Sequence, residues 1–223
     1  MRPSLKALAA LLTYPEAAAI EALPEIALAL TDEIDLTPDL HSRLMALIAV
    51  LQREDLIYCQ EQYVALFDRT RSLSLHLFEH VHGDSRERGP AMVDLLGIYH
   101  KHGLMIADNE LPDYLPLYLE YASLLDEKAG AEAIRDVAHI IAPIRDRLTR
   151  RHTLYAAVFD AVLALSGAAI APAAEPAKDA EADDPAAMDR AWEEAAVVFG
   201  PDSDPAKSQG CDRAATILRR MGA

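Results

Sequence analysis

Residues 72–90 read SLSLHLFEHVHGDSRERGP. Apolar side chains recur at helical spacing in the first half of this stretch and predict a helix over residues 71–82. They are Leu73, Leu77 and Val81. Gly83 ends that helix, and the apolar pattern resumes after a charged segment in a helix expected over residues 88–102. A helix interrupted in this way brings many polar groups to one junction, and surface connections of this kind often carry function.

The rest of the chain predicts an all-α fold, a single-domain helical bundle. Glycine is scarce, with 9 in 223 residues, and the abundance of Ala, Leu, Glu and Arg favours helix. No segment alternates as a strand would, and no repeat of fixed period is present. Pro24 is expected to bend its helix, and Thr37 is expected to cap the helix that Pro38 opens. The other expected helices cover residues 3–13, 16–30, 38–52, 54–67, 114–128, 130–150 and 152–165.

Composition changes after the last expected helix and divides the chain into three parts. Residues 1–165 form the helical domain. Residues 166–187 are rich in Ala, Pro and acidic residues, have too little apolar bulk for a core, and predict a flexible acidic linker. Residues 188–223 form a C-terminal tail with a short amphipathic segment around Trp192, which we expect to dock on the chain's own domain or on a partner.

The formal net charge of −15 limits the kinds of partner. It argues against nucleic-acid binding and favours a basic partner, although an acidic surface also serves solubility. The two cysteines, Cys59 and Cys211, lack metal-ligand spacing and fit a reducing cytosol. The apolar run at the N-terminus is cut at Pro15, so it predicts a first core helix and not a signal peptide. No apolar stretch reaches the roughly 18 residues of a membrane span.

The histidines of the opening stretch match two metal-binding patterns. His76, Glu79 and His80 have the H-x-x-E-H spacing of inverted zinc peptidases. Glu79 and His82 have the carboxylate-x-x-histidine spacing of di-iron bundles, with an imperfect second copy at Asp136 and His139. A metal-dependent helical enzyme is therefore the alternative function. The helical context instead favours histidines packed at a helix end and bonded to backbone or carboxylate groups, with no metal.

Two further groups of residues allow both a structural and a functional interpretation. Tyr114, Tyr118 and Tyr121 share one helix face, either as core residues or as a groove wall with Glu120 beside it. The charged residues after Gly83 are either a solvated run or helix caps. Asp84 and Arg86 are the candidates for the caps.

Two long motifs, LHLFEHVHGDSRERGPAMVDLL at residues 75–96 and NELPDYLPLYLEY at residues 109–121, resemble the nitrate reductase delta-subunit family. These proteins are the NarJ-type assembly chaperones for molybdenum enzymes, related to the TorD-like chaperones. Residues 11–15, LLTYP, and the segment DRAW at residues 189–192 also resemble that family. The resemblance covers residues 4 to 165 and extends more loosely into the tail.

The resemblance implies a cytoplasmic all-α protein that has no catalytic activity, no cofactor and no membrane span of its own. Its client would be the apo catalytic subunit of respiratory nitrate reductase, which carries the molybdenum cofactor. The chaperone would bind a basic amphipathic N-terminal segment of that subunit and keep it competent for cofactor insertion and membrane assembly. A third possibility is a permanent subunit of a membrane complex. The partner-binding positions implied are His76, Phe78, Glu79, His80, His82, Asp84, Arg86, Asp113, Tyr114, Leu117, Tyr118, Glu120 and Tyr121.

Overall fold

The computed structural model describes residues 2–32, 36–83, 85–107 and 110–167. These residues form ten α-helices, a π-helical segment and a 3-10 segment, and they contain no strand beyond one isolated bridge. The predicted all-α fold is confirmed. The helices are α1 (Pro3–Leu11), α2 (Ala17–Glu21), α3 (Leu23–Thr31), α4 (Pro38–Arg53), α5 (Leu56–Tyr63), α6 (Leu77–Val81), α7 (Arg88–Lys101), α8 (Leu115–Leu124), α9 (Glu127–Arg150) and α10 (Ala156–Leu165). The π-helical segment η1 is Val64–Asp68, and the 3-10 segment η2 is Arg71–Leu73.

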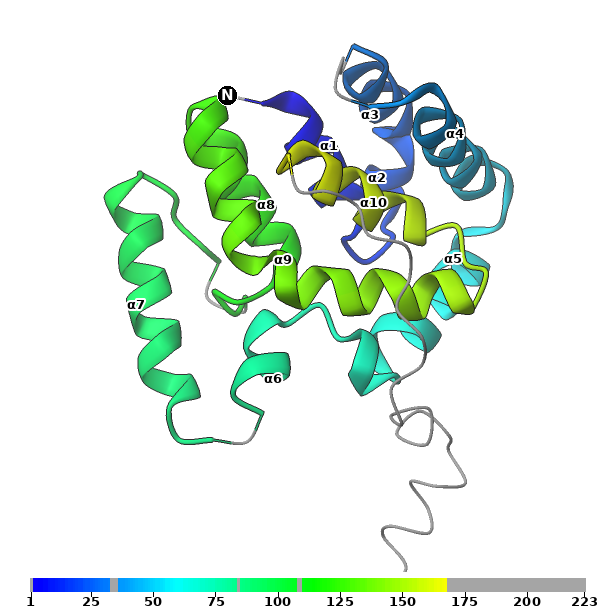
Figure 1. Cartoon of the computed structure of the whole chain (residues 1–223). Coiled ribbons are helices and arrows are strands. Elements are labelled where there is room, and N and C mark those ends of the chain that lie inside the picture. The colour runs from blue at the N-terminus through cyan, green and yellow to red at the C-terminus, as the bar shows by residue number, and fades with distance from the viewer. Residues whose placement is uncertain (1, 33–35, 84, 108–109, 168–223) are drawn as a thin grey trace, which may run out of the picture. The chain divides into compact units, whose positions relative to one another are not determined.

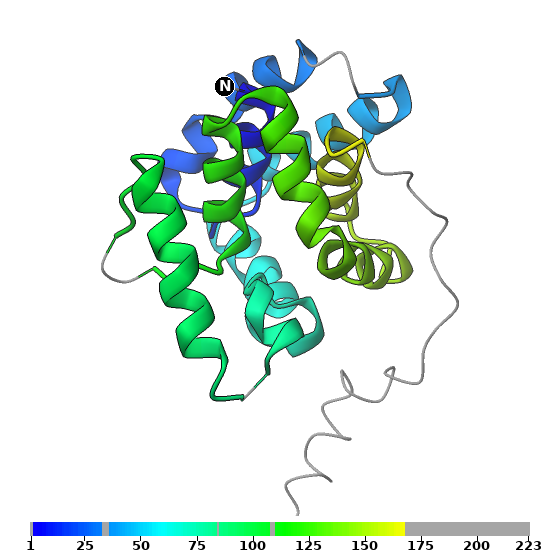
Figure 2. The same cartoon turned by 60° about the vertical axis from the view of Figure 1, so that its left-hand side comes forward.

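The core forms where α1, α8, α9 and α10 pack together (Figure 1). Helix α1 contacts α3, α8 and α10, and α9 runs across α8 and α10. Aliphatic side chains and a few aromatic rings fill this region, and the largest of them are almost completely buried. They include Leu5, Leu8, Leu12, Leu115, Leu119, Ile134 and Phe159. Helix α7 lies at the outer side of α8 in both ribbon views (Figures 1 and 2).

Local signals placed several helix boundaries correctly. The Thr37 hydroxyl accepts from the backbone N–H of Leu40, 3.3 Å away, and Pro38 opens α4, as predicted. Pro116 lies in the first turn of α8, where a missing N–H costs little. Gly83 ends α6 with a φ of +52°.

Other boundaries differ from the prediction. Residues 16–30 form two helices and not one bent helix, because the chain breaks at Ala22 and Pro24 opens α3. The helix expected over 54–67 ends as the wider π turn of η1, with the Arg69 N–H bonded to the Val64 carbonyl oxygen at 2.9 Å. The largest error concerns residues 71–82, of which only Leu77–Val81 are α-helical. The reason lies in the candidate site and is given below.

The interpretation of the linker and of the tail from residue 168 on, including Trp192, lies outside the described residues. None of the helices that the structure does describe combines the length and the apolar character needed to cross a membrane.

Two glycines differ sharply in the room that surrounds them. A Cβ added at Gly130, in the first turn of α9, would lie 2.7 Å from the carbonyl oxygen of Ala122 in α8. That distance is below van der Waals contact, so α8 and α9 approach closely only because residue 130 has no side chain. A Cβ added at Gly97 in α7 would meet nothing within 4 Å.

The substitution Gly130→Ala is therefore expected to lower the free energy of unfolding by about 1–3 kcal/mol, because the added methyl forces two helices apart. Gly97→Ala is the matched control and should raise it by about 0.5–1 kcal/mol through helix propensity alone. Urea denaturation followed by circular dichroism measures both. Equal effects of the two variants would contradict the close α8–α9 packing.

Candidate functional site

The two sequence motifs meet through their backbones. The Leu77 N–H donates to the Asp113 carbonyl oxygen at 2.9 Å, and the Leu115 N–H donates to the Leu75 carbonyl oxygen at 2.8 Å. His76 and Tyr114 form an isolated antiparallel bridge between these two bonds. Residues 74–76 are therefore extended and not helical, which corrects the helix predicted over 71–82. Alternate leucines along this segment are buried, as an extended chain requires. They are Leu73, Leu75 and Leu77.

The side chain of Asp113 supports this backbone pairing from the buried side of the chain. It is completely buried and makes three polar contacts. Its carboxylate accepts from His76 Nδ1 at 3.2 Å and from the Phe78 N–H at 3.1 Å, and Arg88 lies 3.5 Å away. Because Phe78 is in the first turn of α6 and the N-cap residue His76 gives no side-chain cap, Asp113 caps α6 from a distant part of the chain.

These contacts decide the charge state of Asp113. Burial alone raises the pKa of its carboxyl group, but the hydrogen bond and charge of His76, the Phe78 N–H and the charge of Arg88 outweigh burial. The net effect lowers the pKa below its ordinary value of 3.8. Asp113 is therefore an anion at neutral pH, held in place by donors from α6, from the bridge and from α7.

Arg88 and Glu79 complete the polar cluster. Arg88 is the first residue of α7, and its guanidinium group lies 3.4 Å from the Glu79 carboxylate of α6 as well as near Asp113. One arginine thus joins the helices on both sides of the Gly83 turn. Three of the members are partly exposed, namely His76, Glu79 and Arg88.

A surface pocket of about 430 Å³ opens beside this cluster. His76, Glu79 and Arg88 form one side, while the other side comes from η1 and the segment that follows it. The residues from that second side are Phe67, Asp68, Arg71 and Ser74. The pocket therefore offers carboxylates, cations and an aromatic edge within one cavity, which suits a charged peptide segment better than a purely apolar ligand.

Comparison with known proteins shows which family the sequence belongs to. The family model described as "Nitrate reductase delta subunit" matches residues 33–161. The "Nitrate reductase molybdenum cofactor assembly chaperone NarJ" of Escherichia coli (strain K12) is 42% identical over 214 residues, covering 94% of this chain and 88% of that protein. The chain belongs to the nitrate reductase delta-subunit family.

Two further relatives agree with this assignment. The "Probable nitrate reductase molybdenum cofactor assembly chaperone NarW" of the same E. coli strain is 40% identical over 203 residues, 89% of this chain and 84% of that protein. The "Probable nitrate reductase molybdenum cofactor assembly chaperone NarJ" of Bacillus subtilis (strain 168) is 30% identical over 104 residues, 47% of this chain and 56% of that protein.

In this delta-subunit family member the tyrosines of α8 lie mostly in the core. Tyr118 and Tyr121 are each 8% exposed, and the Tyr118 hydroxyl donates to the Ala133 carbonyl oxygen at 2.8 Å. Leu117 is also buried. Tyr114 is only partly buried, and its ring lies 5.5 Å from that of His76. Of this group, Tyr114 contributes to the surface near the pocket, while the burial of the others favours the packing interpretation.

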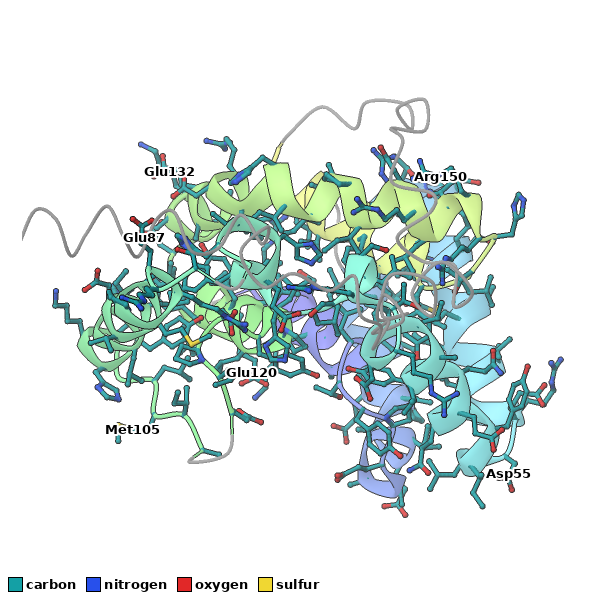
Figure 3. All side chains as sticks on the ribbon, turned by 90° about the horizontal axis from the view of Figure 1, so that it is seen from below. Asp55, Glu87, Met105, Glu120, Glu132 and Arg150 are labelled. Atoms are coloured by element: carbon teal, nitrogen blue, oxygen red, sulfur yellow. The ribbon has the colours of Figure 1, made fainter. Side chains whose placement is uncertain are left out.

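The remaining predicted positions are spread along α6, its following turn and α8. His80 Nε2 donates to the Ser74 carbonyl oxygen at 2.8 Å, and the His82 ring lies 5.5 Å from Phe78. Arg86 is exposed in the turn before α7, as the solvated-run interpretation expects. Asp84 lies outside the described residues. Glu120 is partly exposed on α8 and is labelled in Figure 3.

The metal-binding patterns do not produce a cluster in space. His76 is in the extended segment and bonds Asp113, whereas His80 turns to the backbone of Ser74. Within residues 2–167, apart from the gaps given above, no three His, Cys, Asp or Glu side chains are placed to hold a metal ion.

Sequence reasoning missed Arg88 and the residues that η1 and η2 bring to the pocket. Arg88 was visible only as one charge in a charged run, because its partner Asp113 is 25 positions away. The alternation S-L-S-L-H-L over residues 72–77 was the available signal for the extended segment. It was masked because Leu73 and Leu77 are also four apart.

The Asp113 cluster predicts a pH-dependent stability. Because the pKa of Asp113 is lowered in the folded state, its contribution to the free energy of unfolding is present in full at neutral pH. That contribution is lost as the pH falls below 3.8 toward the lower folded pKa. Asp113→Asn should lower the free energy of unfolding by about 1.5–3 kcal/mol at pH 7, and by progressively less as the pH falls. Melting temperatures measured from pH 7 to pH 3 test this, with Asp94→Asn on the exposed face of α7 as control. A deficit that stays constant down to pH 3 would refute the assignment.

Proposed function

We propose that this protein is a cytoplasmic chaperone for the catalytic subunit of a respiratory nitrate reductase and catalyses no reaction itself. It binds the apo subunit, including a basic amphipathic N-terminal segment, and keeps it competent for molybdenum-cofactor insertion and membrane assembly. The observation that carries the proposal is the 42% identity, over 94% of the chain, to a protein named as a molybdenum cofactor assembly chaperone for nitrate reductase.

The geometry of the candidate site supports the same function. The pocket of His76, Glu79 and Arg88 is anchored by the buried carboxylate of Asp113, which supports a site already formed before the client binds. A preformed site limits the entropy that binding must remove. The chain's net charge of −15 attracts a cationic segment over long range, and the apolar edges around the pocket add contact area.

The affinity required is modest, because a chaperone must also release its client. A dissociation constant near 1 μM corresponds to about −8 kcal/mol, which a few buried anchors supply. Calorimetric titration of the full chain with the N-terminal peptide of the catalytic subunit should give saturable heat in this range. The absence of binding would count against the proposal.

Glu79→Gln is expected to weaken that peptide about threefold to tenfold at low salt and less at high salt, because the lost contact is electrostatic and partly exposed. Glu132→Gln on the outer face of α9 is the matched control and should leave affinity unchanged (Figure 3). Calorimetry at two salt concentrations measures both variants. If the two variants behave alike, the acidic pocket is not where the client binds.

A further inference from the structure

Helix α5 and η1 leave one flank open to solvent. Only three of their side chains are buried, and these lie four residues apart. They are Cys59, Tyr63 and Phe67. On an α-helix, side chains four residues apart point in directions that differ by about 40°. The wider π turn of η1 reduces this rotation, so Phe67 still faces the core. On the open flank Ile57 is 65% exposed, and Tyr14 from the segment after α1 is 41% exposed.

These exposed apolar side chains border a second surface pocket, of about 530 Å³. Tyr14 and Ile57 supply apolar surface, and Glu61 supplies a carboxylate. Val64, Ala65 and Arg69 form the side of the pocket along η1 and just beyond it. The cavity combines an aromatic ring, a branched aliphatic side chain, an acid and an arginine, and the first three suit an amphipathic basic segment.

The second pocket adjoins the candidate site through η1. Val64 and Ala65 line the second pocket, whereas Phe67 and Asp68 of the same π turn line the first. Single π turns occur frequently at functional sites.

A row of rings connects the two pockets. The Tyr14 and Tyr63 rings are 5.7 Å apart, and the Tyr63 and Tyr114 hydroxyls are 3.0 Å apart. The Tyr114 ring then lies 5.5 Å from His76. The two cavities are therefore adjacent, with η1 between them and the buried Tyr63 linking their aromatic residues.

Charge decides which occupant this surface suits. Residues 54–68 contain four carboxylates and no Lys or Arg, and Arg69, which follows them, lines the second pocket with Glu61. They are Glu54, Asp55, Glu61 and Asp68. Glu54 is paired with Arg53, and Asp55 caps α5, so Glu61 and Asp68 are the acids that remain at the two pockets. The chain's net charge of −15 disfavours a second copy of the chain here and favours a cationic amphipathic segment, whose Lys or Arg would meet Glu61 beside the exposed apolar side chains.

We propose that the pocket of Tyr14, Ile57 and Glu61 is a second anchoring site for the same client segment. This inference rests on the proposed function. The segment crosses η1, with one part at the His76–Glu79–Arg88 pocket. A further apolar residue of the segment packs on Tyr14 and Ile57, and a neighbouring Lys or Arg meets Glu61.

Calorimetry with the full chain and the N-terminal peptide of the catalytic subunit tests the proposal. Ile57→Ser should weaken binding about tenfold, equivalent to about 1.4 kcal/mol, at both low and high salt because the lost contact is apolar. Glu61→Gln should weaken it about threefold to tenfold at low salt only. Leu28→Ser, a 64% exposed leucine on α3, is the matched control for the first and should leave affinity unchanged. All variants are surface changes, and unaltered melting temperatures confirm that they fold.

The outcomes separate this inference from the proposed function. If the unmodified chain fails to bind the peptide, the proposed function fails and the second site fails with it. If Glu79→Gln weakens binding while Ile57→Ser and Glu61→Gln do not, the function stands and the second site is refuted. If Ile57→Ser leaves peptide affinity intact but dissociates a dimer seen by light scattering, the pocket is an interface between copies and the proposal is overturned.

Discussion

The buried carboxylate of Asp113 is the constraint on which the site depends. An anion removed from water is costly, and here donors from His76, Phe78 and Arg88 offset that cost. The three donors come from the extended segment, from α6 and from α7, while Asp113 itself precedes α8. One side chain therefore holds four parts of the chain in one arrangement. Without it, the short helix α6 would lose the cap at the Phe78 N–H, and the backbone pairing would lose the side-chain contacts that support it.

Aromatic side chains connect the Asp113 cluster to the N-terminal part of the chain. Tyr114 bonds Tyr63, whose hydroxyl donates to the Leu12 carbonyl oxygen at 2.9 Å. Burial raises the pKa of both phenols, so their hydroxyls stay protonated and able to donate. Residues 11–15 and the two central motifs, which together carry the family resemblance, thus contact one another through Tyr63 and Tyr14. We interpret their shared surface as a preformed place for an unfinished subunit.

The sequence predicted those elements whose causes are local. The cap at Thr37, the proline that opens α4 and the glycine after α6 all act within a few residues, and the structure has them where expected. The extended segment at residues 74–76 could not be predicted in this way, because its partners are about 40 positions away. Spacing also placed Tyr118 and Tyr121 on one face of α8 without showing that α9 and α7 cover that face. Helical spacing predicts the direction in which a side chain points, but only the packing of other helices decides whether it is exposed. Which positions bind a client therefore remains a prediction.

The most direct test of this account is amide hydrogen exchange, measured residue by residue on the full chain with and without the N-terminal peptide of the catalytic subunit. The account predicts that the N–H groups of Leu77, Phe78 and Leu115 are protected in the free protein, because the first two donate to Asp113 and the third to the Leu75 carbonyl oxygen. It also predicts that the peptide slows exchange mainly in α6 and around η1. Rapid exchange at those three amides, or peptide effects confined to the outer face of α9, would contradict it.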